Sequence, residues 1–388
     1  MLGKSVYLIS CSDHYDHRLH VADSYLRSCG YDTTYITSNF DHTSKEVFTC
    51  RVEGCVQLPA RPYRKNLSLD RILSHREFAR DVFRYLEKLP QQPAVLVVQL
   101  PPNFLAYYAA KYKKRHPQVK LIFDVFDLWP ETFPSGKSKK LLAPAFQVWA
   151  AIRDRNLGAA DFVVTECEMF RQKLGLAEKS RTVWLCAEQL TLEKPQPQLR
   201  IDALELCYLG AINNIISIPK ICGLIRELSA QKPVVLHIIG KGERQQEFVD
   251  EAKAAGAEVI FHGAVYDEAQ KLEIMNRCHF GLNIMKESVC VGLTMKSVDY
   301  FRFGLPIINN IPADTEELVR EKGIGVQLEE GCAEKLLALT CEDWLSMRSR
   351  VDTVFQASFE KSQILQKYGD ILDAALQMQC PAERKEEE

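Results

Sequence analysis

The chain lacks the patterns that mark many zinc-binding, membrane-spanning and hydrolytic proteins. Its 13 cysteines are scattered singly, without a CxxC pair or a Cys/His zinc spacing. The first apolar stretch runs only from Val6 to Cys11, which is too short for a signal peptide or a membrane span. The patterns GxSxG and HExxH are also missing. We therefore expect buried, reduced thiols, no metal and a cytoplasmic protein.

Composition is typical of a globular protein with more than one core. The chain has 388 residues, of which 46% are hydrophobic and 26% are charged, so two domains are expected. The net charge of −2 hides an uneven distribution, because cations crowd the first half of the chain. These cations are Arg61, Arg64, Lys65, Arg71, Arg76, Arg80, Arg84, Lys111, Lys113, Lys114, Arg115, Lys137, Lys139 and Lys140. They are either solvated helix faces or a surface for anionic lipid, and without a recognisable motif we expect no nucleic-acid partner.

Strands and helices alternate along the first half of the chain. The predicted strands are Ser5–Cys11, Tyr31–Ile36, Ala94–Gln99, Lys120–Phe126 and Phe162–Val164. The predicted helices are Leu19–Ser28, Ile72–Leu86 and Phe104–Arg115. Short β-branched runs between helices favour a parallel sheet that is covered on both faces.

The same alternation restarts after the Pro-rich segment Glu193–Gln198. The predicted strands are Leu204–Leu209, Val234–Ile239, Val259–Phe261, Phe280–Ile284 and Pro306–Asn309, and the predicted helices are Ile218–Leu228, Glu243–Ala255 and Gln270–Asn276. We predict an α/β fold of two doubly wound, Rossmann-like domains that face each other across a cleft. The predicted boundaries are 1–192, 201–355, a C-terminal helix over 356–380 that packs back on the first domain, and a disordered tail over 381–388.

The most informative segment is Met295–Ile308. Lys296 and Asp299 lie three residues apart, so both occupy one face of a helix that ends at Gly304. Thr294 is suited to cap this helix. Free amides at a helix start favour phosphate, the lysine adds a charge, and the acid can accept hydrogen bonds from sugar hydroxyls. The segment therefore predicts a pocket for a nucleotide diphosphate, although a plain strand–helix–strand unit would read the same way.

Two further strand ends in the second half carry candidate ligand-binding turns. Gly240-Lys241-Gly242 lacks the third glycine of a dinucleotide fingerprint, but it is a tight turn at the edge where open α/β sheets bind ligands. Lys241 is either a phosphate contact or a solvated lysine. The strand end Phe261–Val265 exposes backbone groups that could contact a nucleobase, or it is an ordinary strand end with a histidine.

The first half has polar clusters at comparable places. Asp124, Asp127 and Glu131 surround Trp129 at the end of a strand, where chemistry in parallel sheets is usually found and where a flat ring suits a sugar. The loop Ser12–Arg18 follows the first strand and favours an anionic or hydroxylated substrate over a metal. The segment around His75 could likewise bind an anionic or hydroxylated substrate, and it is richer in basic residues.

Together these segments resemble family 4 glycosyltransferases of the GT-B fold, including bacterial members that act in capsule, exopolysaccharide or O-antigen assembly. The likeness covers most of the chain and is strongest over Cys207–Gly325. The family patterns Gly-x-Gly, F-x-G-x-V and K-x-x-E-Y-x-x-x-G-x-P occur in order here, at Gly240–Gly242, Phe261–Val265 and Lys296–Pro306. Asp127–Glu131 and Asp16–Arg18 resemble loops of the family's first domain.

The chain departs from the family pattern at two places. The glutamate that contacts the donor ribose falls on Asp299, and its partner acid eight residues earlier falls on Val291, so Glu287 is an off-register candidate. The loop Tyr208–Asn214 also lacks the family's diphosphate-binding Arg and Lys. Phosphate neutralisation would then depend on Lys296, the amides of residues 292–294, and Lys241 or Arg244.

The resemblance implies a hexosyltransferase-type enzyme that uses a UDP- or GDP-sugar, without a cofactor, to extend a glycan or lipid-linked acceptor in surface polysaccharide biosynthesis. It implies retention of configuration without metal, and the basic clusters suggest association with the inner face of a membrane. The predicted catalytic residues are Lys296, Asp127 and Lys241. The predicted donor-binding residues are Gly210, Asn213, Gly240, Arg244, His262, Ala264, Glu287, Gly292, Leu293, Thr294 and Asp299. The predicted acceptor-binding residues are His14, Asp16, Arg18, Trp129, Glu131 and His75. A nucleotide-sugar epimerase and a non-catalytic glycan-binding or partner subunit are the alternatives.

Overall fold

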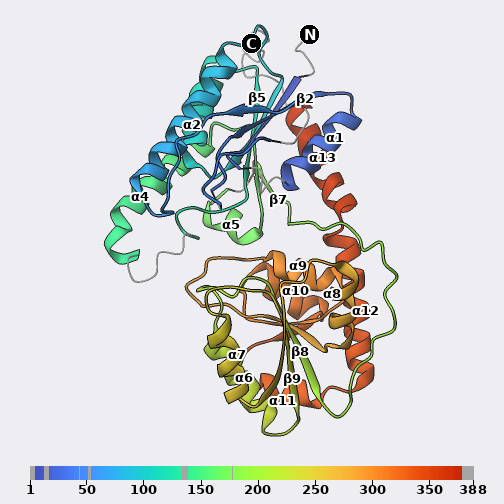
Figure 1. Cartoon of the computed structure of the whole chain (residues 1–388). Coiled ribbons are helices and arrows are strands. Elements are labelled where there is room, and N and C mark those ends of the chain that lie inside the picture. The colour runs from blue at the N-terminus through green and yellow to red at the C-terminus, as the bar shows by residue number, and fades with distance from the viewer. Residues whose placement is uncertain are drawn as a thin grey trace. The chain divides into compact units, whose positions relative to one another are not determined.

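A computed structural model describes residues 5–12, 17–42, 44–50, 54–132, 139–176 and 178–377. The chain forms two compact units (Figure 1). The first comprises the residues up to Trp184 together with those from Ile364 on, and the second comprises Leu185–Gln363. The first part of unit one therefore ends at residue 184, where 192 was expected. The chain returns to this unit at residue 364, where 356 was expected. The predicted tail at 381–388 lies outside the described residues.

The first unit contains a sheet of seven described parallel strands in the order β3-β2-β1-β4-β5-β6-β7. The strands are β1 (Ser5–Ile9), β2 (Asp32–Ser38), β3 (Val56–Leu58), β4 (Val95–Leu100), β5 (Lys120–Val125), β6 (Phe162–Thr165) and β7 (Ser180–Thr182). The helices are α1 (His17–Ser28), α2 (Leu69–Glu87), α3 (Asn103–Arg115), α4 (Lys139–Leu157), α5 (Glu168–Lys173) and α13 (Lys361–Gln377). In Figure 1, α2 and α4 lie on one face of this sheet and α1 and α13 lie on the other.

The centre of this sheet consists of strands whose residues are buried on both faces. Every residue of β4 and β5 is buried, and Val98 pairs with Ile9 on one side and with Phe123 on the other. The strand order reverses direction between β1 and β4, so the loops after these strands diverge and leave room at the carboxyl edge.

Helix α13 belongs to the first unit because polar contacts and close packing hold it there. The Tyr368 hydroxyl donates to Asp124 at 3.2 Å, and the Tyr25 hydroxyl donates to Asp373 at 2.6 Å. Gly369 lies against the Tyr25 ring, and a Cβ atom at this glycine would come within 2.3 Å of it. The C-terminal helix therefore packs on the side of the first sheet that also carries α1.

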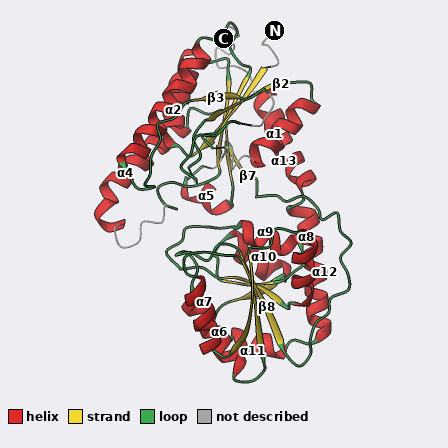
Figure 2. Cartoon of the chain, viewed as in Figure 1, coloured by secondary structure: helices red, strands yellow, loops and turns green. Residues whose placement is uncertain are grey.

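The second unit contains six described parallel strands in the order β10-β9-β8-β11-β12-β13 (Figure 2). They are β8 (Leu204–Leu209), β9 (Val234–Ile239), β10 (Ala257–Gly263), β11 (Phe280–Asn283), β12 (Ile307–Asn309) and β13 (Gly325–Gln327). The helices are α6 (Ile218–Ser229), α7 (Gln245–Ala254), α8 (Glu268–Arg277), α9 (Met295–Arg302), α10 (Asp314–Lys322), α11 (Cys332–Ala338) and α12 (Cys341–Ser358). The order reverses between β8 and β11.

The predicted fold class is confirmed, since both sheets are parallel and doubly wound. Strands β8 and β9 begin and end at the predicted residues because each is a buried, mainly apolar run with one polar residue, Glu205 in β8 and His237 in β9. The C-terminal helix expected over 356–380 is α13, which begins at Lys361 and is separated from α12 at Phe359 and Glu360. In the part of the chain that the structure describes, no helix combines the length and apolarity that a membrane crossing requires.

Candidate functional site

The loops after β8 and β9 meet at the carboxyl edge of the second sheet. The Gly210 amide donates to the Ile239 carbonyl at 2.9 Å, and the Ile212 amide donates to the Lys241 carbonyl at 3.0 Å. A Cβ atom at Gly240 would lie 2.0 Å from the Gly210 carbonyl oxygen, and one at Gly242 would lie 2.2 Å from the Ile212 carbonyl oxygen. The glycines of the Gly-x-Gly turn therefore allow the loop after β9 to pack directly on the loop after β8.

Helix α9 begins at this edge with a complete capping box. The Thr294 hydroxyl accepts a hydrogen bond from the Ser297 amide at 3.0 Å, while Ser297 Oγ accepts one from the Thr294 amide at 3.3 Å. Thr294 Oγ1 also donates to Asn283 Oδ1 at 3.0 Å, which ties the helix start to the end of β11. The predicted cap is thus present, and its position relative to the sheet is fixed.

Only some of the predicted phosphate-binding amides are available. The Thr294 amide is engaged by Ser297, and Leu293 is buried. The Gly292 carbonyl accepts hydrogen bonds from the Thr315 amide at 2.9 Å and the Thr315 hydroxyl at 2.7 Å, so this turn is held in place. The amides of Met295 and Lys296 are at the first turn of α9, where helix geometry leaves N–H groups without an intrahelical acceptor.

Lys296 reaches from α9 to the end of β8. Its ammonium lies 4.1 Å from the centroid of the Tyr208 ring, and its side chain passes over Gly210, where a Cβ atom would lie 3.4 Å from Lys296 Cε. Burial lowers the pKa of Lys296 to about 7, with a smaller opposing effect from Cys207. A diphosphate bound beside this lysine would raise its pKa, so the lysine would be protonated in the complex.

Asp299 and Tyr300 follow on the same helix. Burial raises the pKa of the partly exposed Asp299 carboxyl, while Lys271 and Arg302 oppose this shift. The fully buried Tyr300 hydroxyl accepts a hydrogen bond from the Leu209 amide at 2.7 Å and donates to the Cys207 carbonyl at 3.1 Å. Tyr300 thus anchors α9 to β8 and holds Lys296 over that strand's end, a positioning role that the sequence analysis did not assign.

Most of the remaining predicted donor-binding side chains already form an ion pair or a hydrogen bond with another residue of the protein. Glu287 is exposed and pairs with Lys220 at 2.7 Å, and Arg244 pairs with Glu247. Asn213 Oδ1 accepts a hydrogen bond from the Ile215 amide at 3.1 Å, whereas Lys241 is exposed on the turn after β9. Lys296 is therefore the cation that the fold holds most firmly over the end of β8.

His262 stands at the end of β10 and continues into the sheet through a second histidine. His262 Nε2 lies 3.0 Å from Nδ1 of His237, whose Nε2 lies 3.1 Å from the Glu205 carboxylate. Burial lowers the pKa of both histidines. Ala264, two residues further along, is exposed, so the backbone just after this strand is accessible, as a nucleobase contact would require.

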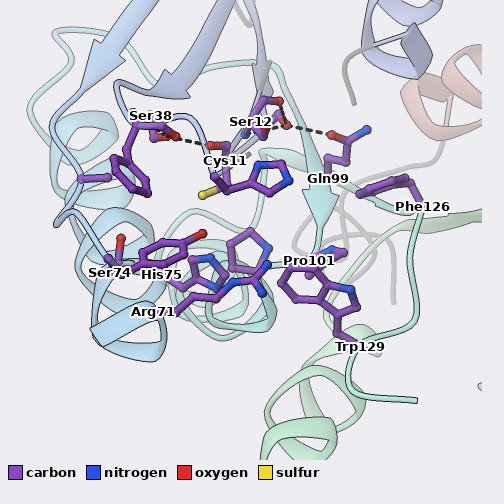
Figure 3. Close-up of a pocket in the computed structure, with 16 residues that line it drawn as sticks. Cys11, Ser12, Ser38, Arg71, Ser74, His75, Gln99, Pro101, Phe126 and Trp129 are labelled. Carbon is purple, nitrogen blue, oxygen red and sulfur yellow. Dashed lines mark hydrogen bonds between the residues drawn. The ribbon is translucent and has the colours of Figure 1, made fainter. Parts of the chain in front are cut away.

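The first unit has a narrow pocket at its own carboxyl edge, between the ends of β1, β2, β4 and β5 (Figure 3). We call it the Arg71 pocket. Trp129 and His75, both predicted acceptor contacts, line it together, with their rings stacked at a centroid distance of 5.9 Å. Arg71 and Tyr63 also line it, although the sequence pattern alone groups Arg71 with the surface cations.

Two other predicted acceptor-binding residues of the first unit, Arg18 and Glu131, form ion pairs with residues of the same unit. Arg18 is buried and pairs with the fully buried Asp124 at 3.0 Å, which favours a structural role over acceptor binding. Glu131 binds the buried Arg153 through two hydrogen bonds of 2.9 and 2.8 Å. No local sequence signal distinguishes these residues, because their partners are far away along the chain. His14 and Asp16 lie outside the described residues.

Asp127 is held beside the pocket rather than in it. Its carboxylate accepts a hydrogen bond from the Thr132 hydroxyl at 2.5 Å, and burial raises its pKa.

Among the described residues, no three His, Cys, Asp or Glu side chains are grouped to hold a metal ion, and the described cysteines are all free thiols.

Comparisons with known proteins agree with this architecture. Residues 204–342 match the family described as Glycosyl transferases group 1. No curated protein sequence matches the chain. A solved structure of similar fold is the apo form of the lipopolysaccharide outer core galactosyltransferase WaaB, with a TM-score of 0.67 and 13% identity over 95% of this chain and 99% of that one.

Two further structures have the same likeness over nearly the full chain. HepE from Anabaena, solved in complex with UDP, has a TM-score of 0.62 and 13% identity, over 96% of this chain and 100% of that one. WaaG, a glycosyltransferase involved in lipopolysaccharide biosynthesis, has a TM-score of 0.61 and 11% identity, over 94% of this chain and 99% of that one. Identities this low establish the fold, which is GT-B, and the family match lies in the second unit.

Proposed function

We propose that this chain, a glycosyltransferase of the GT-B fold whose second unit matches the Glycosyl transferases group 1 family, transfers a sugar from a nucleotide-sugar donor to a glycan or lipid-linked glycan. The donor binds at the carboxyl edge of the second unit, and the acceptor binds to the first. The observation that carries this proposal is Lys296, held over the end of β8 at the start of α9 with a pKa of about 7.

The chemistry requires stabilisation of a leaving diphosphate as the glycosidic bond opens. Lys296 and the first-turn amides of α9 supply positive charge at one place, and such pre-positioned groups are effective in transition states. We propose that these groups perform this role without a metal and that a phosphate oxygen of the leaving group takes the acceptor proton, with retention of configuration. UDP is the first nucleotide to test, because HepE was solved with it.

Asp299 is proposed to accept hydrogen bonds from the donor ribose. Changing Asp299 to Asn removes a charge-assisted bond of about 1.5–3 kcal/mol, so the donor KM should rise roughly 10- to 100-fold with a smaller change in kcat. Steady-state kinetics with varied donor measure both values. Asp250→Asn, an exposed site on α7, is the matched control. An unchanged donor KM would move the ribose contact away from Asp299.

The alternatives differ in how nucleotide release depends on the acceptor. Incubating the protein with UDP- and GDP-sugars, with and without a panel of glycans, should give nucleoside diphosphate release that depends on an acceptor. Release without any acceptor would support an epimerase. Donor binding without turnover over the panel would support a non-catalytic subunit, a possibility that arises because Arg244 is paired with Glu247 and no cation follows β8.

We further propose that the protein works at the cytoplasmic face of a membrane in surface polysaccharide assembly. A surface groove between α2 and α3 is lined by Phe83, Tyr108, Glu87 and five cations, namely Arg80, Arg84, Lys88, Lys111 and Arg115. Arg115 pairs with Glu87, and Arg80 and Arg84 pair with Asp81, so the cations outnumber the acids by five to two. Arg71, counted with the basic cluster in the sequence, does not belong to it because it is buried in the Arg71 pocket. Lys137 lies outside the described residues.

This groove should bind anionic lipid reversibly. Each cation near such a surface contributes about 1 kcal/mol, so changing Arg84, Lys88 and Lys111 together to Gln should cost about 3 kcal/mol, more than a hundred-fold in partitioning. Co-sedimentation with anionic liposomes at low salt measures this change. Gln at Lys253, Arg277 and Lys322, exposed cations of the second unit, is the charge-matched control. Equal sedimentation of both triple variants would contradict the membrane assignment.

A further inference from the structure

The Arg71 pocket has a specific chemistry that the transfer reaction alone does not explain. Helix α2 starts beside it with Ser68 as its cap, which accepts a hydrogen bond from the Arg71 amide at 3.2 Å. Arg71 is thereby placed in the first turn with its side chain turned into the pocket (Figure 3). Only 5% of Arg71 is exposed, so the fold keeps its guanidinium in a largely buried, partly apolar space.

Two aromatic rings and one backbone carbonyl fix the position of the guanidinium. Its carbon lies 4.2 Å from the centroid of Trp129 and 5.7 Å from the centroid of Tyr63. Nη1 donates to the Asn66 carbonyl at 3.2 Å. A planar guanidinium held in this way can offer a fork of two N–H groups to a carboxylate or phosphate.

His75 lies one turn further along α2 and adds a neutral polar group. Burial is the main reason that its pKa lies well below the ordinary value, and Arg71 contributes to the same shift. The ring is 5% exposed, and its Nδ1 atom has no hydrogen-bond partner among the described residues. A buried ring nitrogen without a partner is costly, and a bound hydroxyl could satisfy it.

The other described residues that line the pocket are the imidazole of His42 and hydroxyl, amide, thiol and apolar groups, and none of them is Asp or Glu. Ser10 Oγ donates to Gln99 Oε1 at 2.8 Å, which shows that the polar side is pre-arranged at the ends of β1 and β4. Burial raises the pKa of the Cys11 thiol to about 12, so this lining thiol is uncharged at neutral pH. The lining therefore combines the Arg71 guanidinium with two histidines, neutral polar groups and apolar walls.

We propose that the Arg71 pocket binds an anionic sugar unit, with Arg71 on the carboxylate or phosphate and His75 on a ring hydroxyl. The pocket then selects acidic glycans as acceptors of the transferase. The role as an acceptor site rests on the proposed transferase function. Binding of an anionic sugar to the pocket does not, because it needs neither donor nor turnover.

The test is binding of three small probes to the full chain in the absence of donor. Glucuronate, glucose 6-phosphate and glucose are titrated separately, with binding followed by saturation-transfer NMR. At least one anionic probe should bind about tenfold or more tightly than glucose. Preference for glucuronate assigns a carboxylate and preference for glucose 6-phosphate assigns a phosphate. Equal binding of all three probes, or binding of none, overturns the proposal.

Variants at one helix position identify the pocket as the site. Arg71→Gln should weaken the preferred anionic probe about tenfold or more and leave glucose unchanged. Arg76→Gln, an exposed cation on the same helix, is the matched control and should bind like the wild type. If Arg71→Gln does not fold, Arg71→Lys, which keeps the charge without the fork, should lose part of the affinity. Anion binding that neither Arg71 variant changes places the site elsewhere and overturns the assignment.

Discussion

Changing Lys296 to Ala should lower turnover by a factor on the order of 10²–10³ at saturating donor, because loss of one transition-state charge donor costs about this much. The side chain is held over Tyr208 and Gly210, where a developing diphosphate charge would be closest to the start of α9. Burial already disfavours its charged form, so removing it should not destabilise the fold.

Steady-state rates and thermal midpoints of the same preparations measure this effect. Lys253→Ala, an exposed lysine on α7, should behave like the wild type and controls for loss of a positive charge. Near wild-type turnover of Lys296→Ala would remove the lysine from the diphosphate site, whereas a large drop in its thermal midpoint would indicate a structural role.

Changing Gly242 to Ala should destabilise the second unit by about 3 kcal/mol and weaken donor binding. The new Cβ atom would lie 2.2 Å from the Ile212 carbonyl oxygen and 2.6 Å from its carbon, and backbone atoms cannot rotate away as a side chain can. The loop after β8 would then move from its place beneath Lys296.

Urea unfolding of the variant, together with donor titration, measures both effects. Gly223→Ala is the matched control, since a Cβ atom at this helical position on α6 meets nothing within 4 Å and should be neutral or stabilising. Wild-type stability of Gly242→Ala would mean that the two loops are not packed as closely as the structure has them.

Sequence periodicity predicted the parts of the fold that depend on local patterns. Strands β8 and β9 were predicted at their observed limits because each is a buried, mainly apolar run between turns. The short strands β3 and β7, with three residues each, were missed because runs of this length carry no measurable period. Helix α4 was missed as well, and it contains Pro144, which disfavours a helical prediction.

The site could be predicted only as far as its residues are close in sequence. Thr294, Lys296 and Asp299 belong to one helix start, so their spacing revealed them. The Tyr300 hydroxyl instead bonds to Leu209, which is 91 residues away, and Arg18 pairs with Asp124 at a separation of 106. A single sequence contains no signal for such partners, and for the same reason Arg71 was assigned to a basic surface before the fold placed it beside Trp129.

The most direct test of the account is the pH dependence of UDP binding between pH 7 and 8.5. The free protein loses the Lys296 proton above about pH 7, whereas a bound diphosphate would raise the pKa of this lysine, so binding above pH 7 must take up a proton. Burial keeps the pKa values of His237 and His262 below their ordinary range and raises those of Tyr208 and Tyr300, so these neighbours do not titrate in this window.

Isothermal titration in buffers of different ionisation enthalpy measures both affinity and proton uptake. The account predicts that the Kd of UDP rises by up to about tenfold per pH unit above pH 7, with uptake approaching one proton, and that Lys296→Met binds weakly without this dependence. A wild-type Kd that stays constant from pH 7 to 8.5, or equal affinity and equal proton uptake in Lys296→Met, would contradict the assignment of this edge as the diphosphate site.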